Sequence, residues 1–350
     1  MRSHNRLMKW VLTVLLVVTA LALALPVLAQ DGPPPLPGEV VVGELNAPRG
    51  IAFDDDGNLI VAVAGSGGDV EMVLSNPEGE STMRLGMSGE IISVAPDGAV
   101  SDVIAGFPSY ASPMETTGLY RAIPHDNSLW VLFSGSGPVT TGAFWMDTIA
   151  EIDMTTLATV RVINLNNYET VNDPDGRGYD SNVADVAWGA DGTLYIVDAG
   201  MNALLSWTEA DGLATVQSWG NDVPTSIEVA DDASFYIGFL GEGIAPGVGK
   251  VEHWADGELV HTYAGLTGVT DILLAGDTLY AVQLFLFGEQ GPGPGNVVML
   301  TEEAATPVAE GIPAPFALAM DADGALYVSF GTIAFAPGMT GGVLKLDVGM

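Results

Sequence analysis

The stretch Val183-Ala-Asp-Val-Ala-Trp-Gly-Ala-Asp-Gly-Thr-Leu-Tyr-Ile-Val-Asp198 places two short apolar segments on either side of an Asp-Gly pair. Asp191 and Gly192 favour a tight turn, because glycine tolerates a positive φ and an aspartate side chain can accept hydrogen bonds from its own backbone. The run 194–197 is apolar at every position, as expected of a strand that is covered on both faces. The stretch therefore predicts a buried β-hairpin.

The same strand–turn–strand unit occurs six times along the chain. The second strands begin at Leu59, Leu129, Leu194, Phe235, Leu279 and Leu326. The last three intervals are 41, 44 and 47 residues, and periods in the forties with this content are typical of a β-propeller with about one blade per repeat. We find no convincing amphipathic helix between the strands, which argues against a TIM barrel or a Rossmann fold. The sequence predicts an all-β, six-bladed β-propeller with four-stranded blades.

The sixth unit contains sequence for three strands rather than four. Residues 39–45 resemble residues 306–312, which we expect to form the outermost strand of the fifth blade. We therefore predict that 39–45 completes the last blade beside 342–347. A ring closed in this way leaves no open sheet edge between its first and last blades.

Residues 1–29 have the pattern of a cleavable signal peptide. Arg2, Arg6 and Lys9 precede an apolar run over 11–25, and that run is short for a membrane span of ~20 residues. We expect a secreted or periplasmic protein with no stable membrane insertion after cleavage; an uncleaved N-terminal anchor is the less favoured alternative.

After the signal peptide, residues 30–38 are rich in proline and glycine and predict a short tether. Residues 39–350 then form the propeller as one domain. The chain carries 44 acidic and 10 basic residues, a formal net charge of −34, so nucleic acid and anionic lipid are poor partners. With no cysteine there are no disulfides and no cysteine-ligated metal.

The long connections of the predicted propeller all emerge on one face. They are 64–88, 106–118, 134–147, 166–182, 238–249, 283–295 and 330–341. Because binding residues concentrate on loops held by a rigid scaffold, we expect this face to bind a protein or a small molecule.

The densest polar cluster lies in the connection that enters the third blade. It offers Glu169, Asn172, Asp180 and Asn182, and we expect Asp198 and Asn202 to lie next to them, since they follow a strand of the same blade on the same face. Carboxylate and amide oxygens are the ligands that Ca²⁺ prefers. A structural alternative is that these side chains bond backbone groups of a long ordered loop, and the routine use of Asp, Asn and Ser in turns favours it.

Three further charged residues fall on the innermost strands. Asp185 and Asp271 occupy the same position in two repeats, at the channel end of the strand. Two inward carboxylates there could bind a cation or act as an acid–base pair. More often, such residues accept hydrogen bonds from neighbouring strand ends. Arg121 interrupts an otherwise apolar position of the repeat, and a buried guanidinium needs a partner. A structural ion pair with the channel carboxylates is the simplest interpretation, and an anchor for an anionic ligand is the alternative.

Several motifs together resemble one family. They are Leu45-Asn-Ala-Pro-Arg-Gly-Ile-Ala-Phe-Asp-Asp-Asp-Gly57, Gly106-Phe-Pro-Ser109, Tyr168-Glu169, Asn172-Asp-Pro-Asp-Gly176, Asp180-Ser-Asn182, Asp198-Ala-Gly-Met-Asn202 and Val223-Pro-Thr225. The chain resembles the ScyD/ScyE family of exported, NHL-like six-bladed propellers, named from scytonemin biosynthesis in cyanobacteria. It departs from the family pattern at Asp173, which is inserted, and at Met201, where a glycine is expected. The resemblance implies an exported propeller and brings no established catalytic mechanism.

More distantly, the expected fold is similar to the gluconolactonase and strictosidine-synthase propellers, which hold a divalent cation or a catalytic glutamate in the channel. Their ligand sets do not map residue by residue onto this sequence.

Two functions are therefore open. The first is a non-catalytic propeller that binds a partner on its long-loop face. The alternative is a divalent-metal-dependent hydrolase or lactonase with its site in the channel. Asp185 and Asp271 favour the alternative, whereas the scarcity of His and Lys favours the first, so we predict a binding protein. No cofactor is assigned; Ca²⁺ is the cation that the polar cluster would hold.

Overall fold

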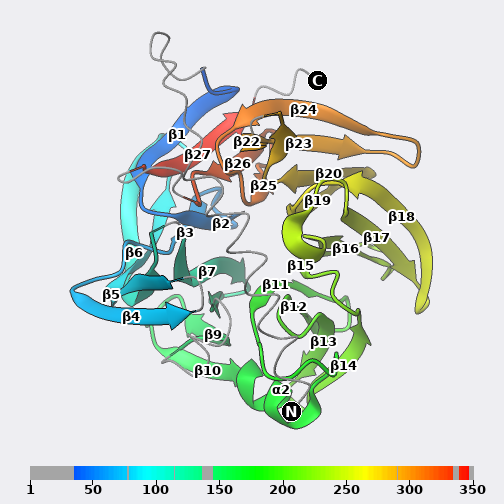
Figure 1. Ribbon diagram of the computed structural model, residues 1–350, viewed down its shortest axis with the longest axis horizontal. Coiled ribbons are helices and arrows are strands. Elements are labelled where there is room, and N and C mark those ends of the chain that lie inside the picture. The colour runs from blue at the N-terminus through cyan, green and yellow to red at the C-terminus, as the bar shows by residue number, and fades with distance from the viewer. Residues whose placement is uncertain are drawn as a thin grey trace.

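The computed structural model describes residues 35–76, 79–113, 115–135, 145–289, 291–333 and 339–346 (Figure 1). The predicted signal peptide 1–29 and the first part of the tether lie outside the described residues. The regular secondary structure of the described chain is almost entirely antiparallel strand, which confirms the all-β class. None of its helices is long and apolar enough to cross a membrane.

The strands form successive groups in chain order. The first group is one continuous sheet of nine strands. Eight of them follow one another: β2 (Pro48–Phe53), β3 (Leu59–Val63), β5 (Gly79–Val94), β6 (Val100–Ala111), β7 (Thr116–His125), β8 (Ser128–Ser134), β9 (Thr148–Asp153) and β10 (Thr159–Asn164). The ninth, β4 (Val70–Asn76), pairs with β5.

Two four-stranded sheets follow. They contain β11 (Val183–Trp188), β12 (Leu194–Asp198), β13 (Ala203–Thr208) and β14 (Gly212–Ser218), then β15 (Pro224–Val229), β16 (Phe235–Phe239), β17 (Gly249–Ala255) and β18 (Glu258–Leu266).

The last two sheets complete the chain. One contains β19 (Val269–Ala275), β20 (Thr278–Gln283), β23 (Gly295–Leu300) and β24 (Ala305–Ile312), and a small hairpin of β21 (Leu286–Gly288) and β22 (Gly291–Gly293) branches from it; the other contains β25 (Leu318–Met320), β26 (Leu326–Phe330), β27 (Gly341–Leu346) and β1 (Gly38–Leu45). The predicted pairing of the N-terminal strand is observed, since Glu39 lies opposite Lys345 and Val40 opposite Leu344.

Six strands lie nearest the centre of the molecule: β2, β7, β11, β15, β19 and β25 (Figure 1). Each of them contacts the next, and β25 contacts β2. The six large apolar clusters follow the same order, because each one packs side chains from two successive groups of strands, including the last group against the first. Burial of these apolar clusters between neighbouring sheets is the main favourable contribution to folding.

Five predicted connections contain regular structure, one of them being 283–295 with the hairpin of β21 and β22. Within 64–88, β4 and β5 form a hairpin, and within 106–118, β6 extends to Ala111 and pairs with the start of β7. Within 166–182, the chain forms the helix α2 (Leu165–Asn172), which corrects the expectation of no helix. A short 3₁₀ helix, η2 (Glu242–Ile244), lies in the connection 238–249.

Helix α2 is short and weakly amphipathic, which is why periodicity did not reveal it. The Asn164 side chain caps its N-terminus by accepting a hydrogen bond from the Asn167 N–H, and Asp173 ends it in the left-handed conformation with φ of 39°. Its buried residues are Leu165, Asn166 and Glu169. The helix thus carries a glutamate into the interior.

Candidate functional site

Arg121, Asp185 and Asp271 meet at the centre, where the inner strands converge; we name them the central network. The Arg121 Nη2 lies 2.7 Å from Oδ1 of Asp271, and its Nε lies 3.2 Å from Oδ1 of Asp185. All three residues are at most 5% exposed. The structural ion pair considered from sequence is therefore present.

The remaining atoms of the central network bind backbone groups of other inner strands. Asp185 accepts hydrogen bonds from the N–H groups of Val186 and Ile227, Asp271 accepts one from Leu318, and the Arg121 Nε donates to the Ala184 carbonyl. Burial raises the pKa of Asp185 to about 7, against the effect of Arg121, and the nearby Asp271 adds to the rise. This network joins β7, β11, β15, β19 and β25 and leaves its carboxylates engaged.

A repeated irregularity aims these side chains inward. The register shifts between Leu119 and Arg121 in β7, between Val183 and Asp185 in β11, and between Val269 and Asp271 in β19. A β-bulge redirects the side chain beside it, so each shift turns the charged residue toward the centre. Sequence alignment placed Arg121 in a different repeat position from the two aspartates and so did not predict this common geometry.

A second group of acids, three buried and two half-buried, lies where the loop before β9, helix α2 and residues 173–182 meet. We name it the polar cluster; its acids are Asp147, Glu169, Asp175, Asp180 and Asp198. Asp198 is fully buried and accepts four hydrogen bonds, from the Ser181 hydroxyl and from the N–H groups of Asn182, Gly200 and Met201. The predicted proximity of the 166–182 connection to Asp198 is thus observed.

Two amides of the polar cluster also hold the loop together. The Asn202 Nδ2 donates to Asp175 at 2.8 Å and to the Gly200 carbonyl, and its Oδ1 accepts from the Val223 N–H. The Asn182 Oδ1 accepts from the Ser134 hydroxyl. Asn172 points elsewhere: it is exposed, and its side chain donates to the Tyr168 carbonyl of its own helix. Turn and loop support therefore accounts for Asn182, Asp198 and Asn202.

Asp147 and Asp175 are members of the cluster that the sequence prediction did not select. Asp147 is fully buried and accepts hydrogen bonds from the Gly135 N–H and the Asn166 Nδ2, both at 3.1 Å. Burial, followed by the charge of Asp198, raises the pKa of Asp147 to about 7. The sequence signal was weak, because Asp147 is one acid at the end of a long connection and only the fold brings it next to α2.

Glu169 differs from Asp147 and Asp198, the other two acids of the cluster that are fully buried. It is 1% exposed, and within the described part of the chain neither of its carboxylate oxygens has a hydrogen-bond partner. Burial raises its pKa to about 8, and the charges of Asp198, Asp180 and Asp175 add to the rise. The Asp180 amide lies toward the carboxyl and offsets part of the shift, but it is outside hydrogen-bonding geometry. The predicted site residue Glu169 is therefore a buried carboxyl without a structural partner.

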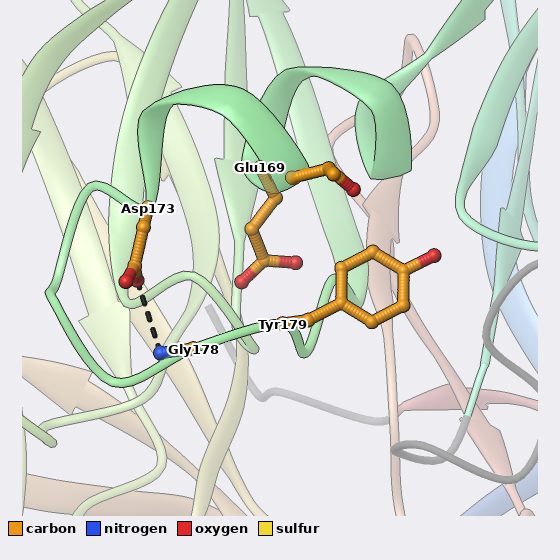
Figure 2. A pocket seen from close by; sticks show the side chains of 5 residues that line it. Glu169, Asp173, Gly178 and Tyr179 are labelled. Atoms are coloured by element: carbon orange, nitrogen blue, oxygen red, sulfur yellow. Dashed lines mark hydrogen bonds between the residues drawn. The ribbon is translucent and has the colours of Figure 1, made fainter.

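A pocket of about 330 Å³ lies beside α2, lined by Glu169, Thr170, Asp173, Gly178 and Tyr179. Figure 2 shows the Glu169 side chain extending from α2 toward the segment that carries Gly178 and Tyr179. The Asp173 carboxylate on the other side accepts a hydrogen bond from the Gly178 N–H at 3.0 Å. Among the described residues, no group of three or more His, Cys, Asp or Glu side chains could hold a metal ion. The expected Ca²⁺ site stays a prediction.

No family model matches the chain, and no curated protein matches it. Solved structures do. A gluconolactonase from Xanthomonas campestris has a TM-score of 0.56 at 10% identity, covering 91% of this chain and 99% of its own. A putative oxidoreductase (glucose dehydrogenase) from a Thermus species has a TM-score of 0.53 at 15% identity, covering 89% of this chain and 100% of its own.

The aldose sugar dehydrogenase from Streptomyces coelicolor has a TM-score of 0.52 at 14% identity, covering 88% of this chain and 96% of its own. These similarities show a β-propeller-like fold. At such identities they extend to the fold alone.

Proposed function

We propose that this chain is an exported, six-bladed β-propeller of the type its motifs resemble, with β1 closing the ring in the last blade. The cycle of contacts among the six inner strands and the six apolar clusters between successive groups support this proposal. Deleting residues 35–45 should unfold the whole domain, because it exposes the edge of β27 and opens the ring. A deletion variant with an unchanged melting temperature would argue against closure.

The function we propose is binding of a small organic molecule in the pocket beside α2. The observation that carries it is Glu169, a buried carboxyl on the pocket wall that has no partner among the described residues. Burying such a group costs free energy unless something compensates it, and strongly perturbed carboxyls in clefts are candidates for functional sites. A bound ligand supplies the missing partner.

We further propose that the bound molecule is a substrate, which makes the chain an enzyme rather than a non-catalytic binding protein. Proteins named gluconolactonase and aldose sugar dehydrogenase have a similar fold, so this fold is one that enzymes use. The hydrolase or lactonase alternative then has its site beside α2, because the central carboxylates are engaged by Arg121. A non-catalytic binding role is the second candidate, and the polar cluster's extensive use of backbone donors favours it.

The test follows acid release from δ-gluconolactone and simple aliphatic lactones at constant pH, above the spontaneous rate. Wild type is compared with Glu169→Gln, each with Ca²⁺ or with EDTA at matched ionic strength. Hydrolysis that Glu169→Gln abolishes supports an enzyme with its site beside α2. Hydrolysis that survives in Glu169→Gln but not in Asp271→Asn moves the site to the centre. No hydrolysis, with ligand binding retained, selects the non-catalytic candidate.

A further inference from the structure

The lining of the pocket beside α2 has a definite chemical character. Glu169 and Asp173 are acids, Thr170 carries a hydroxyl, and Tyr179 presents an aromatic ring (Figure 2). The described lining contains no Lys, Arg or His. Arg177, the basic residue of the adjacent loop, is directed to Asp175, with its Nε 3.8 Å from Oδ2. A ligand that enters this pocket therefore meets negative charge and an aromatic ring.

The environment of Glu169 favours a positively charged ligand. Its two oxygens are unpartnered within the described residues, and Asp175, Asp180 and Asp198 act on it as repelling charges. A buried carboxylate is stabilised by a cation that pairs with it, because the pair replaces the lost hydration. A neutral ligand would leave the repulsion within the polar cluster unchanged.

Tyr179 supplies the second feature that suits a cation. Its side chain lines the same pocket as Glu169, and the residue is 45% exposed, so it is accessible to a ligand. The face of an aromatic ring attracts cations, and quaternary ammonium groups are commonly recognised by such rings. One carboxylate with an aromatic ring is a different ligand set from the six to eight oxygens that Ca²⁺ takes, in line with the lack of any metal-holding group among the described residues.

We propose that the pocket binds a small organic ammonium ion, with the Glu169 carboxylate as its counter-ion and the Tyr179 ring against its cationic head. This inference rests on the pocket assigned in the proposed function and adds the chemical class of the ligand. The excess of acidic residues over the whole chain also concentrates cations near the surface.

The test uses choline and its neutral carbon isostere, 3,3-dimethylbutan-1-ol, with binding measured by calorimetry at constant ionic strength. The two molecules have the same shape, so their difference isolates the charge. Choline should bind at least about tenfold more tightly than the alcohol. Glu169→Gln should remove this preference, and Tyr179→Leu, a change at a half-exposed ring, should weaken choline several-fold.

A matched control separates the pocket from general attraction to an acidic protein. Glu303→Gln removes one exposed carboxylate far along the chain, in the turn before β24, and should leave choline binding unchanged. Melting temperatures of the three variants establish that each is folded. Equal losses in Glu303→Gln and Glu169→Gln would reduce the effect to non-specific attraction and overturn the inference.

The pH dependence gives a readout that a structural role of Glu169 would not produce. Choline keeps its charge at every pH, so any titration belongs to the protein. With a Glu169 pKa of about 8, choline affinity should rise about tenfold per pH unit below that value and level off above it. In Glu169→Gln the profile should be flat, and a wild-type profile that is equally flat contradicts the assignment of Glu169 as counter-ion.

The two proposals fail separately. If choline binds as described and no lactone is hydrolysed, the ammonium site stands and the enzymatic proposal falls. If lactones are hydrolysed in a Glu169-dependent way and choline binds no better than its isostere, the enzyme stands and the ammonium inference falls.

Discussion

The central network and the polar cluster both bury carboxylates, but they compensate them differently. At the centre, Asp185 and Asp271 share one guanidinium and accept backbone hydrogen bonds from several strands. In the polar cluster, Asp198 is equally well satisfied by four donors, whereas Glu169 has no partner within the described residues. Burial and an altered pKa are common to both regions, so neither property identifies a binding site. The proposed pocket rests instead on the unsatisfied Glu169 carboxyl.

The largest expected effect tests whether the central network is structural. Arg121→Met removes the guanidinium and leaves two buried carboxylates facing each other. Breaking a buried pair in this way costs roughly 3–5 kcal/mol, measured as the free energy of unfolding in urea. The triple variant Arg121→Met, Asp185→Leu, Asp271→Leu should recover part of the loss. A cost below about 1 kcal/mol for Arg121→Met would mean that the centre is hydrated rather than structural.

The next effect tests the structural part of the polar cluster. Asp198→Asn exchanges one acceptor oxygen for an NH₂ group, so some of the four donors to Asp198 lose their acceptor. Leaving buried donors unsatisfied costs about 2 kcal/mol. The exposed turn residue Asp97, which accepts one hydrogen bond from the Ala99 N–H, provides the control. Asp97→Asn should change stability by less than about 1 kcal/mol, and equal costs would remove the distinction between the two aspartates.

A smaller, pH-dependent effect separates Glu169 from Asp147 and Asp198, whose carboxylates accept hydrogen bonds. Its folded pKa of about 8 lies above the ordinary value of 4.5, so the folded state holds a proton that the unfolded chain has released between these values. The contribution of Glu169 to the free energy of unfolding therefore falls as pH rises from 4.5 to 8 and then levels off. Glu169→Gln lacks this dependence and should gain about 1–2 kcal/mol relative to wild type between pH 5 and pH 9.

The measurement is urea unfolding of both proteins across that pH range. Asp147 and Asp180 titrate in both proteins, so the difference between the two curves isolates Glu169. Two parallel curves would show that the Glu169 carboxyl is compensated after all, and the contrast with Asp198 would disappear.

The smallest expected effect is that of a surface ion pair, which should contribute less to stability than the buried pairs of the central network. Arg161 contacts Glu151 and Glu209 near the surface and lies 5.2 Å from the centroid of the Trp207 ring. Its side chain is 30% exposed, so Arg161→Gln should cost only about 0.5–1 kcal/mol, and this cost should shrink in high salt. If Arg161→Gln lowered the free energy of unfolding as much as Arg121→Met, burial would not determine how much an ion pair contributes to stability.

The sequence by itself determined the strand pattern of this protein. Six Asp-Gly-like turns between apolar segments fix hairpins locally, and the likeness of 39–45 to an outer strand predicted the observed pairing of Glu39 with Lys345. It also predicted that Asp180 and Asn182 lie near Asp198, because the connections of one blade end on one face. Such features depend on turn-forming residues and on the alternation of apolar and polar residues, and both are determined by residues close together in the sequence.

Only the tertiary structure decided which charged residues are satisfied. Arg121 is separated from Asp271 by 150 residues, and β-bulges aim both at the centre. Asp147 reaches α2 from another connection, and α2 itself formed where no helix was expected. Whether a carboxylate has a partner depends on donors brought together from distant strands. The sequence named Asp198 and Glu169 alike as site candidates, and only the fold gave Asp198 four donors and gave Glu169 none among the described residues.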